Sequence, residues 1–177
     1  MIYQFILTIL IFILCLIYFR DILKKDYSQF IKNTKKNCET IFNYWLIVTF
    51  VFGFINIISP YIFNVHNHYQ DELNGKINAY ILIAVVILAP LIEEAVFRVF
   101  PTTFIKNKYF YFIISSIAFS SLHFLGGNVL ALLPYFAFGI IMCHLYLKEK
   151  NLIINIATHT LYNSVVMIMT NLMLLLK

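Results

Sequence analysis

The chain has 177 residues, of which 62% are hydrophobic and only 12% charged, and its mean hydropathy is +0.84. These values lie far from those of soluble domains, so they exclude a soluble enzyme. A secretory signal is one short apolar run before a polar chain, whereas apolar runs recur here to the last residue. The composition therefore predicts an integral membrane protein without a separate soluble domain.

Six apolar runs of roughly the length that crosses a bilayer follow one another along the chain. They cover residues 2–19, 41–63, 77–100, 109–125, 129–147 and 152–176. Short connections favour one helical bundle, so we expect an all-α, polytopic membrane protein with a single domain over residues 1–177. Residues 1–76 supply two N-terminal helices, and residues 77–177 supply a core of four.

The basic residues predict the orientation of these helices, because Lys and Arg accumulate on the cytoplasmic side of short connections. If six helices alternate, eleven of the 13 basic residues fall on one side and both termini lie outside. The eleven are Arg20, Lys24, Lys25, Lys32, Lys35, Lys36, Arg98, Lys106, Lys108, Lys148 and Lys150. This bias explains the net charge of +5 without a nucleic-acid partner, and it predicts that the basic first connection touches anionic headgroups.

Two adjacent acids, Glu93 and Glu94, lie inside the third apolar run. A charge at the bilayer centre costs about 3 kcal/mol on insertion scales, so such acids mark sites that handle an ion, a proton or a substrate. Arg98 follows Glu94 at i+4, close enough to pair with it on one helical face. Glu93 projects about 100° away and stays available for chemistry.

Histidines and an asparagine occupy later apolar runs. His123 ends the segment that begins at Phe119, while His159 and Asn163 are spaced i, i+4 and so project from one face of the last helix. Two histidines together with a buried acid pair favour a functional site over simple packing.

Depth decides whether these residues can meet, because a helix rises about 1.5 Å per residue. If the third helix ended at Arg98, Glu93 and His123 would lie at different depths. We therefore predict that it continues to about Phe104, kinked at Pro101, and that the chain returns from Lys108. Glu93 and His123 then converge with the face formed by His159 and Asn163, near the midplane or in the cytoplasmic half.

Three motifs now stand in order on successive helices. They are Glu93 to Arg98 (EExxxR), Phe119 to His123 (FxxxH) and His159 to Asn163 (HxxxN). This set resembles the CAAX prenyl protease and bacteriocin-processing family, also called CPBP or Abi, a group of intramembrane proteases. The resemblance covers the third to sixth helices and implies cleavage of a peptide bond in a membrane-associated peptide or protein tail.

The resemblance also implies roles for these residues. Glu93 is the base that activates water, His123 positions or polarises that water, and His159 with Asn163 stabilises the oxyanion. Glu94, paired with Arg98, holds the acid-bearing turn in orientation. The residue types suit this chemistry, since hydrolysis needs a held water, a base and hydrogen-bond donors for the oxyanion.

A metal remains an alternative at this stage. Glu93, His123 and His159 would form a three-ligand zinc site with one open position. An HExxH helix is absent, and the resemblance fits a glutamate-dependent, metal-free mechanism at least as well. We therefore expect no cofactor, with zinc as the alternative.

Two other functions compete with proteolysis. A family member acting as a scaffold or bacteriocin self-immunity protein would keep the same polar pocket without cleavage. A small proton-coupled transporter would also carry intramembrane acids and histidines, but repeated halves and paired broken helices are missing. The bias toward Ile, Asn, Lys, Tyr and Phe is typical of an AT-rich genome, which favours a bacterial plasma membrane and a peptide precursor as substrate.

Overall fold

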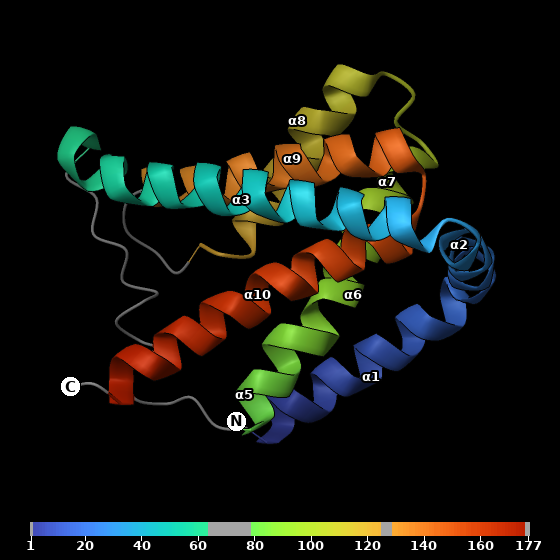
Figure 1. The fold of residues 1–177 in the computed structure, drawn as a ribbon, viewed down its shortest axis with the longest axis horizontal. Helices are drawn as coiled ribbons and strands as arrows, with labels where there is room; N and C mark the ends of the chain where they lie inside the picture. Colours follow the sequence, from blue (N-terminus) through green and yellow to red (C-terminus); the bar gives the residue numbers. More distant parts are fainter. Residues whose placement is uncertain (1, 64–78, 125–128, 176–177) are drawn as a thin grey trace.

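The computed structural model describes residues 2–63, 79–124 and 129–175, and every element in these ranges is helical (Figure 1). The N-terminal part contains α1 (Ile2–Tyr18), α2 (Arg20–Lys32) and α3 (Thr34–Phe63). The remainder contains α5 (Ala79–Ile83), η1 (Ala84–Leu88), α6 (Ala89–Glu94), η2 (Ala95–Val99), α7 (Phe100–Thr102), α8 (Lys108–Ser121), η3 (Val129–Leu132), α9 (Leu133–Glu149) and α10 (Leu152–Leu175). The predicted all-α, multi-pass membrane protein is confirmed.

The number of full-length spans differs from the predicted six. Among the described residues, four helices are long and apolar enough to cross a membrane, or five if α1 and α2, bent by 73°, count as one span. The four are Thr34–Ser59, Ala79–Thr102, Val129–Glu149 and Leu152–Leu172.

The predicted fourth span corresponds to α8, which has only 14 residues. At 1.5 Å per residue it is about 21 Å long, short of the roughly 30 Å hydrocarbon core. Hydropathy overestimates its length because the apolar residues after Ser121 have left the helix: His123 and Phe124 donate their amides to Ser120 and Ser121, three residues back.

The third span continues past Arg98 as predicted, and it ends at Thr102, shortly before α8 begins at Lys108. Its irregularity is not a simple kink at Pro101, because two π-helical segments, η1 and η2, flank the acid-bearing α6. π-Helical turns inside α-helices occur often at functional sites.

Prolines explain why two carbonyls in these π-helical segments lack a backbone N–H donor and accept from side chains instead. In η1 the amide of Ala89 donates to the carbonyl of Ala84, five residues back. At the same spacing the donor for the carbonyl of Val85 would be residue 90, which is a proline without an N–H. The carbonyl of Val85 is bonded instead by the side-chain amide of Asn163, at 2.9 Å. Near Pro101, the carbonyl of Phe97 accepts from Ser115 in the same way.

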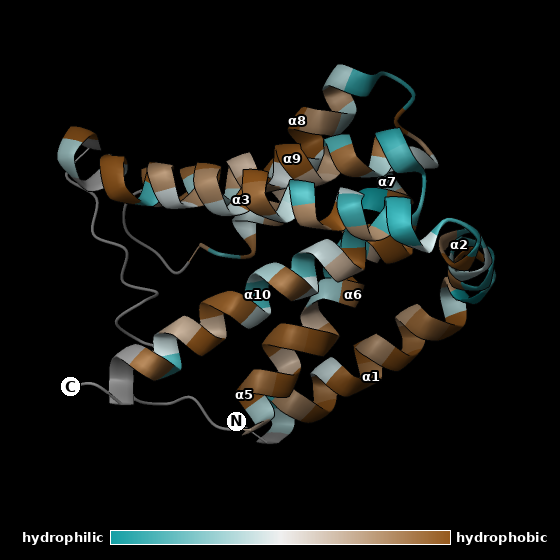
Figure 2. Cartoon of the chain, in the orientation of Figure 1, coloured by the Kyte–Doolittle hydropathy of each residue, from teal (hydrophilic) through white to brown (hydrophobic). Residues whose placement is uncertain are grey.

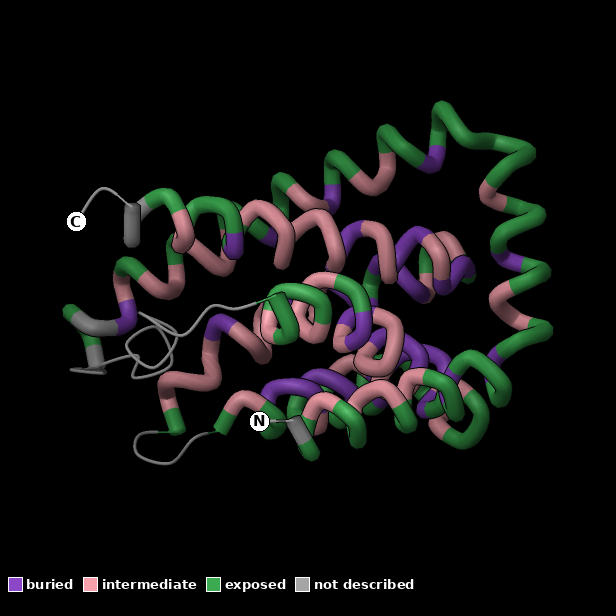
Figure 3. Tube along the Cα trace, turned by 90° about the horizontal axis from the view of Figure 1, so that it is seen from below, coloured by how far each residue is buried: buried purple, intermediate pink, exposed green. Residues whose placement is uncertain are grey.

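The helices form two layers, and the acid-bearing α6 packs against α10. In Figure 1, α3 and α9 run side by side, with α10, α6 and α1 on the other side, and contacts join α10 to both α3 and α6. Buried residues concentrate where the helices meet, and exposed residues face outward (Figure 3). Many exposed residues are large and apolar, including Leu14, Phe50 and Ile57, which suits a surface that contacts lipid.

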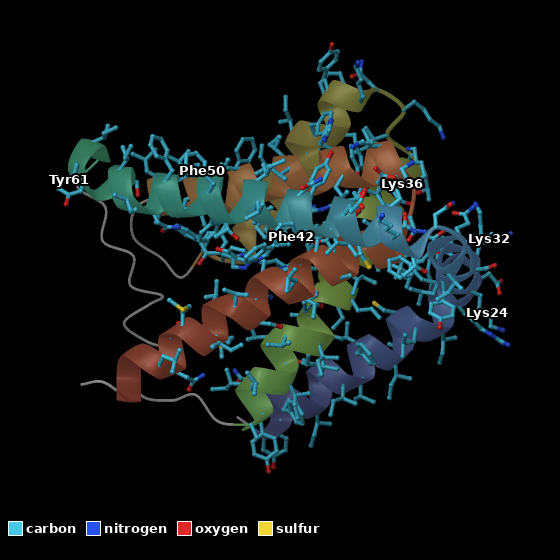
Figure 4. All side chains as sticks on the ribbon, viewed as in Figure 1. Lys24, Lys32, Lys36, Phe42, Phe50 and Tyr61 are labelled. Atoms are coloured by element: carbon cyan, nitrogen blue, oxygen red, sulfur yellow. The ribbon has the colours of Figure 1, made fainter. Side chains whose placement is uncertain are left out.

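Hydrophilic residues gather at one end of the bundle (Figure 2). This end holds α2, the beginning of α3 and the connections from α7 to α8 and from α9 to α10, and the labelled Lys24, Lys32 and Lys36 lie there (Figure 4). The first turn of α1 and the last turns of α10 lie at the opposite end. The distribution matches alternating crossings, and the assignment of the basic end to the cytoplasm stays a prediction.

Gly139 allows α8 and α9 to approach closely. A Cβ atom at this position would lie 2.9 Å from the Cα atom of Ser116, whereas a Cβ at Gly53 would meet nothing within 4 Å. Small residues at helix crossings are a common means of close packing in membranes.

We expect Gly139→Ala to destabilise the protein by about 1–3 kcal/mol, because the added methyl group forces α8 away from α9. Gly53→Ala is the matched control, and we expect it to be neutral or slightly stabilising. The free energy of unfolding of both variants is measured in mixed micelles that contain an increasing fraction of a denaturing detergent. Equal midpoints for the two would contradict the close approach.

Asp26 links α2 to the start of α10. Its carboxylate accepts from the Leu152 amide at 2.6 Å and its carbonyl from the Asn151 side chain at 2.8 Å, while the side chain of Asn151 also accepts from the Ile154 amide at 3.2 Å. α2 carries six charged residues among thirteen and is too polar for the hydrocarbon core. The first turn of α10 is thus capped by its own Asn151 and by an acid from another helix.

Stability should depend on pH through Asp26. Burial raises the pKa of this carboxyl above its ordinary value of 3.8, while the Leu152 amide and the charge of Lys25 oppose the rise. The folded state therefore binds the proton more readily than the unfolded chain, and stability falls as pH rises through this pKa. We expect the wild type to gain stability over Asp26→Asn on acidification from neutral pH. A stability difference between the wild type and Asp26→Asn that does not change with pH would contradict this expectation.

Candidate active site

Glu94 and Arg98 form a fully buried ion pair on successive turns of the third span. The Nε atom of Arg98 lies 3.1 Å from Oε2 of Glu94, and both side chains are 0% exposed. Arg98 also donates to Ser115 at 3.1 Å and lies over the ring of Phe119, 4.8 Å from its centroid. The i+4 spacing predicted this pair, and the surrounding bonds hold the arginine in one place.

Asn155 on α10 is a member of the site that sequence reasoning missed. Its side-chain amide donates to Oε2 of Glu94 at 3.1 Å and to the carbonyl of Met142 at 2.9 Å. It precedes His159 by four residues and Asn163 by eight, so the three share one face of α10. This polar stripe was the signal in the sequence that could have identified it.

His159 lies between the two carboxylates. Its Nδ1 is 2.9 Å from Oε1 of Glu94, and its Nε2 is 3.6 Å from Oε2 of Glu93. The imidazole is 4% exposed and is covered by the ring of Phe138, 4.7 Å away between centroids. Each ring nitrogen therefore faces one carboxylate, with Nδ1 toward Glu94 and Nε2 toward Glu93.

The two acids have different surroundings. Glu94 is 0% exposed and is bonded by Arg98, Asn155 and His159. The side chain of Glu93 is 16% exposed, and within the described part of the chain its only ion pair or hydrogen bond is the 3.6 Å contact to His159. Glu93 is therefore the carboxylate with room for a further partner.

His123 and Asn163 form no hydrogen bond or ion pair with the acids or with His159 among the described contacts. The Nδ1 of His123 is 3.3 Å from the carbonyl of Phe119, and its ring stacks on Tyr135 at 4.0 Å. The ring of Phe119 contacts both His123 and His159, with centroids 5.1 and 6.1 Å apart. Asn163 donates to Val85, as described above. Among the described residues, Glu93 and His159 are thus in direct contact and His123 is linked to His159 through Phe119, whereas the bond of Asn163 is to Val85 and not to this group.

Three further residues behind the site gave no clear signal in the sequence. Tyr111 donates to the carbonyl of Arg98 at 3.2 Å, and Cys143 donates to Ser115 at 3.2 Å, so both support the turn that carries Arg98. Single tyrosines, serines and cysteines are common in apolar helices, and only tertiary structure shows which of them turn inward.

The alternative zinc set does not fit this arrangement. No group of three or more His, Cys, Asp or Glu residues in the described ranges is placed to hold a metal ion. Both nitrogens of His159 face carboxylates, and His123 makes no hydrogen bond to Glu93 or His159 among the described contacts. We derive no catalytic step through a metal.

A cavity of about 460 Å³ lies elsewhere, between α3, α8 and α9, and the acids do not line it. Its lining residues are apolar apart from Tyr44 and His144, and the Tyr44 hydroxyl lies 2.7 Å from Nδ1 of His144. His144 is exposed near the basic end of α9, and it belongs to this cavity rather than to the acid site.

The fold and site together define a class of protein: a multi-pass helical membrane protein with a desolvated acid pair and a histidine between the acids. The chain belongs to the type II CAAX prenyl endopeptidase Rce1-like family, whose sequence profile matches residues 75–165, just over half of its length. This range includes all three motifs, and the family resemblance inferred from them is confirmed.

A comparison that covers most of the chain agrees with this assignment to a family of membrane proteases. The chain is 27% identical over 174 residues to a protein of Bacillus subtilis (strain 168) named "Putative membrane peptidase YdiL", with 92% of this chain and 70% of the relative covered. No solved structure matches the chain.

Proposed function

We propose that this protein is an intramembrane endopeptidase that hydrolyses a peptide bond in a membrane-associated peptide or protein tail. The contrast between the two acids carries the proposal. Glu94 is saturated by three partners, whereas Glu93 is partly exposed, next to a histidine and otherwise unbonded among the described residues. A carboxylate in a largely apolar site with room for one more partner is suited to activate water.

In the proposed reaction Glu93 is the base. Glu93 accepts a proton from water as the water oxygen attacks the carbonyl carbon of the scissile bond, and an oxyanion forms. Glu93 then returns the proton to the amide nitrogen as the C–N bond breaks. The immediate products are a carboxylic acid and an amine, and transfer of the acid proton to the amine leaves a carboxylate and an ammonium group, so atoms and charges balance.

The other residues orient and stabilise the reacting groups. Glu94 holds the ring of His159 so that its Nε2 faces Glu93. Donors near the oxyanion supply the main electrostatic stabilisation in such reactions. We assign this role to His159 with Asn163, whose side chain would exchange Val85 for substrate, and we assign His123 to positioning the water.

The site's depth supports cleavage within the membrane. His159 lies eight residues after Asn151, and at 1.5 Å per residue this is about 12 Å from the start of α10 at the basic end. With that end in the cytoplasm, the active site lies in the cytoplasmic half. We place the protein in a bacterial plasma membrane, a proposal that the Bacillus relative supports.

The test is cleavage of membrane-anchored fluorogenic peptides by the purified chain in vesicles, with His159→Ala compared with His144→Ala. We expect His159→Ala to lower the rate by about 10²–10³-fold, the usual cost of removing one donor to the oxyanion. His144→Ala should retain most activity, because this histidine lies outside the acid site. Equal rates for both variants, or peptide binding without cleavage by the wild type, would overturn the proposal in favour of a scaffold or immunity protein.

A chelator arm belongs to the same assay. We expect unchanged cleavage after chelation, since the described residues do not form a metal-binding group. Activity that is lost on chelation and restored by zinc would contradict the metal-free mechanism.

A further inference from the structure

α2 has three distinct faces. The first packs on the protein through Ile22, Leu23, Asp26 and Phe30, which are buried or half-buried. The second consists of exposed residues at helical spacing, Arg20, Lys24, Tyr27 and Ile31, and the third adds the exposed Lys25, Ser28 and Lys32.

The exposed faces suit a membrane surface more than bulk water. Tyr27 is 59% and Ile31 54% exposed, and these apolar side chains lie in line with Arg20 and Lys24. Asp21 is the one exposed acid of α2, and the basic surface continues into α3 with Lys35 and Lys36. A helix with cations beside an aromatic and an aliphatic side chain is typical of the lipid interface.

The direction of α2 agrees with this surface. It bends by 73° from α1, so the chain turns away from the line of that helix at the basic end of the bundle (Figure 4). A helix too polar for hydrocarbon, attached at this angle to an apolar one, can lie in the headgroup layer.

The buried face of α2 makes the contact that matters for the site. Asp26 is 2% exposed and bonds both Leu152 and Asn151 at the start of α10. Asn155 follows one turn later and His159 one turn after that, and both contact Glu94. α2 is thus hydrogen-bonded to the beginning of the helix that carries half of the acid site.

We propose that the exposed face of α2 docks on anionic phospholipid headgroups, and that the Asp26 contact uses this docking to hold the first turns of α10 in place. The partner is the lipid surface itself, whose negative charge complements Arg20, Lys24, Lys25 and Lys32. The effect on cleavage rests on the proposed function, whereas the effect on α10 does not.

Hydrogen–deuterium exchange of the full chain tests this without any activity. The probes are vesicles of phosphatidylcholine alone and of phosphatidylcholine mixed with phosphatidylglycerol. Exchange of the backbone amides of residues 152–155 should be at least about fivefold slower in the anionic vesicles, the factor expected for one lysine attracted to the surface. High salt should reduce the difference, because it screens exposed charges.

Two sets of variants show whether α2 carries the effect. Lys24→Gln/Lys25→Gln/Lys32→Gln should lose the lipid dependence, whereas Lys106→Gln/Lys108→Gln, with two basic residues of the same end outside α2, should keep it. Asp26→Ala should speed exchange in both vesicles and remove the difference between them.

Three results would overturn the proposal: identical exchange of the wild type in both vesicles, a lipid effect that survives the triple α2 variant, or equal losses in the two lysine sets. The peptide assay in the same vesicles separates this from the proposed function. A lipid-dependent exchange without any cleavage would reject the protease assignment and leave the α2 contact standing.

Discussion

Replacing Glu93 with Gln is expected to lower the rate of peptide cleavage by about 10²–10⁴-fold, because the amide cannot accept the proton of the attacking water. Stability should change little, since the side chain of Glu93 is partly exposed and its one described polar contact is 3.6 Å long. Cleavage of a membrane-anchored peptide and unfolding in mixed micelles measure the two quantities on the same preparation.

The neighbouring residue supplies the matched control. Glu94→Gln makes the same chemical change one position along, where the carboxylate is fully buried against Arg98. We expect this variant to lose stability as well as activity. Two results would contradict the different roles of the two acids: full cleavage by Glu93→Gln, or a loss of stability in Glu93→Gln as large as that in Glu94→Gln.

The second large effect concerns stability. Glu94→Ala leaves Arg98 buried and without its carboxylate, and breaking a buried ion pair in this way costs about 3–5 kcal/mol. Asn155 loses a partner at the same time. The free energy of unfolding in mixed micelles should therefore fall by a large part of the total.

A double replacement distinguishes the cost of an unpaired buried charge from the cost of altered side-chain packing. Glu94→Met/Arg98→Met removes both charges and keeps side chains of similar volume, so it should recover much of the stability lost in Glu94→Ala. If the double variant is as unstable as the sum of its single replacements, the cost lies in packing and the buried pair is not its source.

Sequence patterns predicted some features of the site and missed others. The i+4 spacing of Glu94 and Arg98 was enough to predict their pair, because residues at this spacing share a helical face. The third helix was predicted to continue past Arg98 because a longer helix brings the later motifs to the level of the acids, and the span does continue to Thr102. Asn155 was missed although it continues the stripe of His159 and Asn163.

Other features required the packed structure. The length of α8 depends on where its hydrogen bonds end, and apolar residues beyond Ser121 gave no sign of that end. The π-helical segments depend on Pro90 and Pro101 together with side chains on other helices that bond the freed carbonyls. The contact of Asp26 with Leu152 joins residues 126 positions apart, and no local pattern predicts such a distance.

The sequence by itself determined that this is a helical membrane protein and which family motifs it carries, because hydropathy and spacing act along one chain. Tertiary structure decided which carboxylate is saturated and which is open. That distinction depends on Arg98 and on the two α10 side chains that bond Glu94, and on the one histidine that reaches Glu93 among the described residues. Burial and hydrogen bonding between distant segments are properties of the packed chain, and adjacent residues of the same type differ only there.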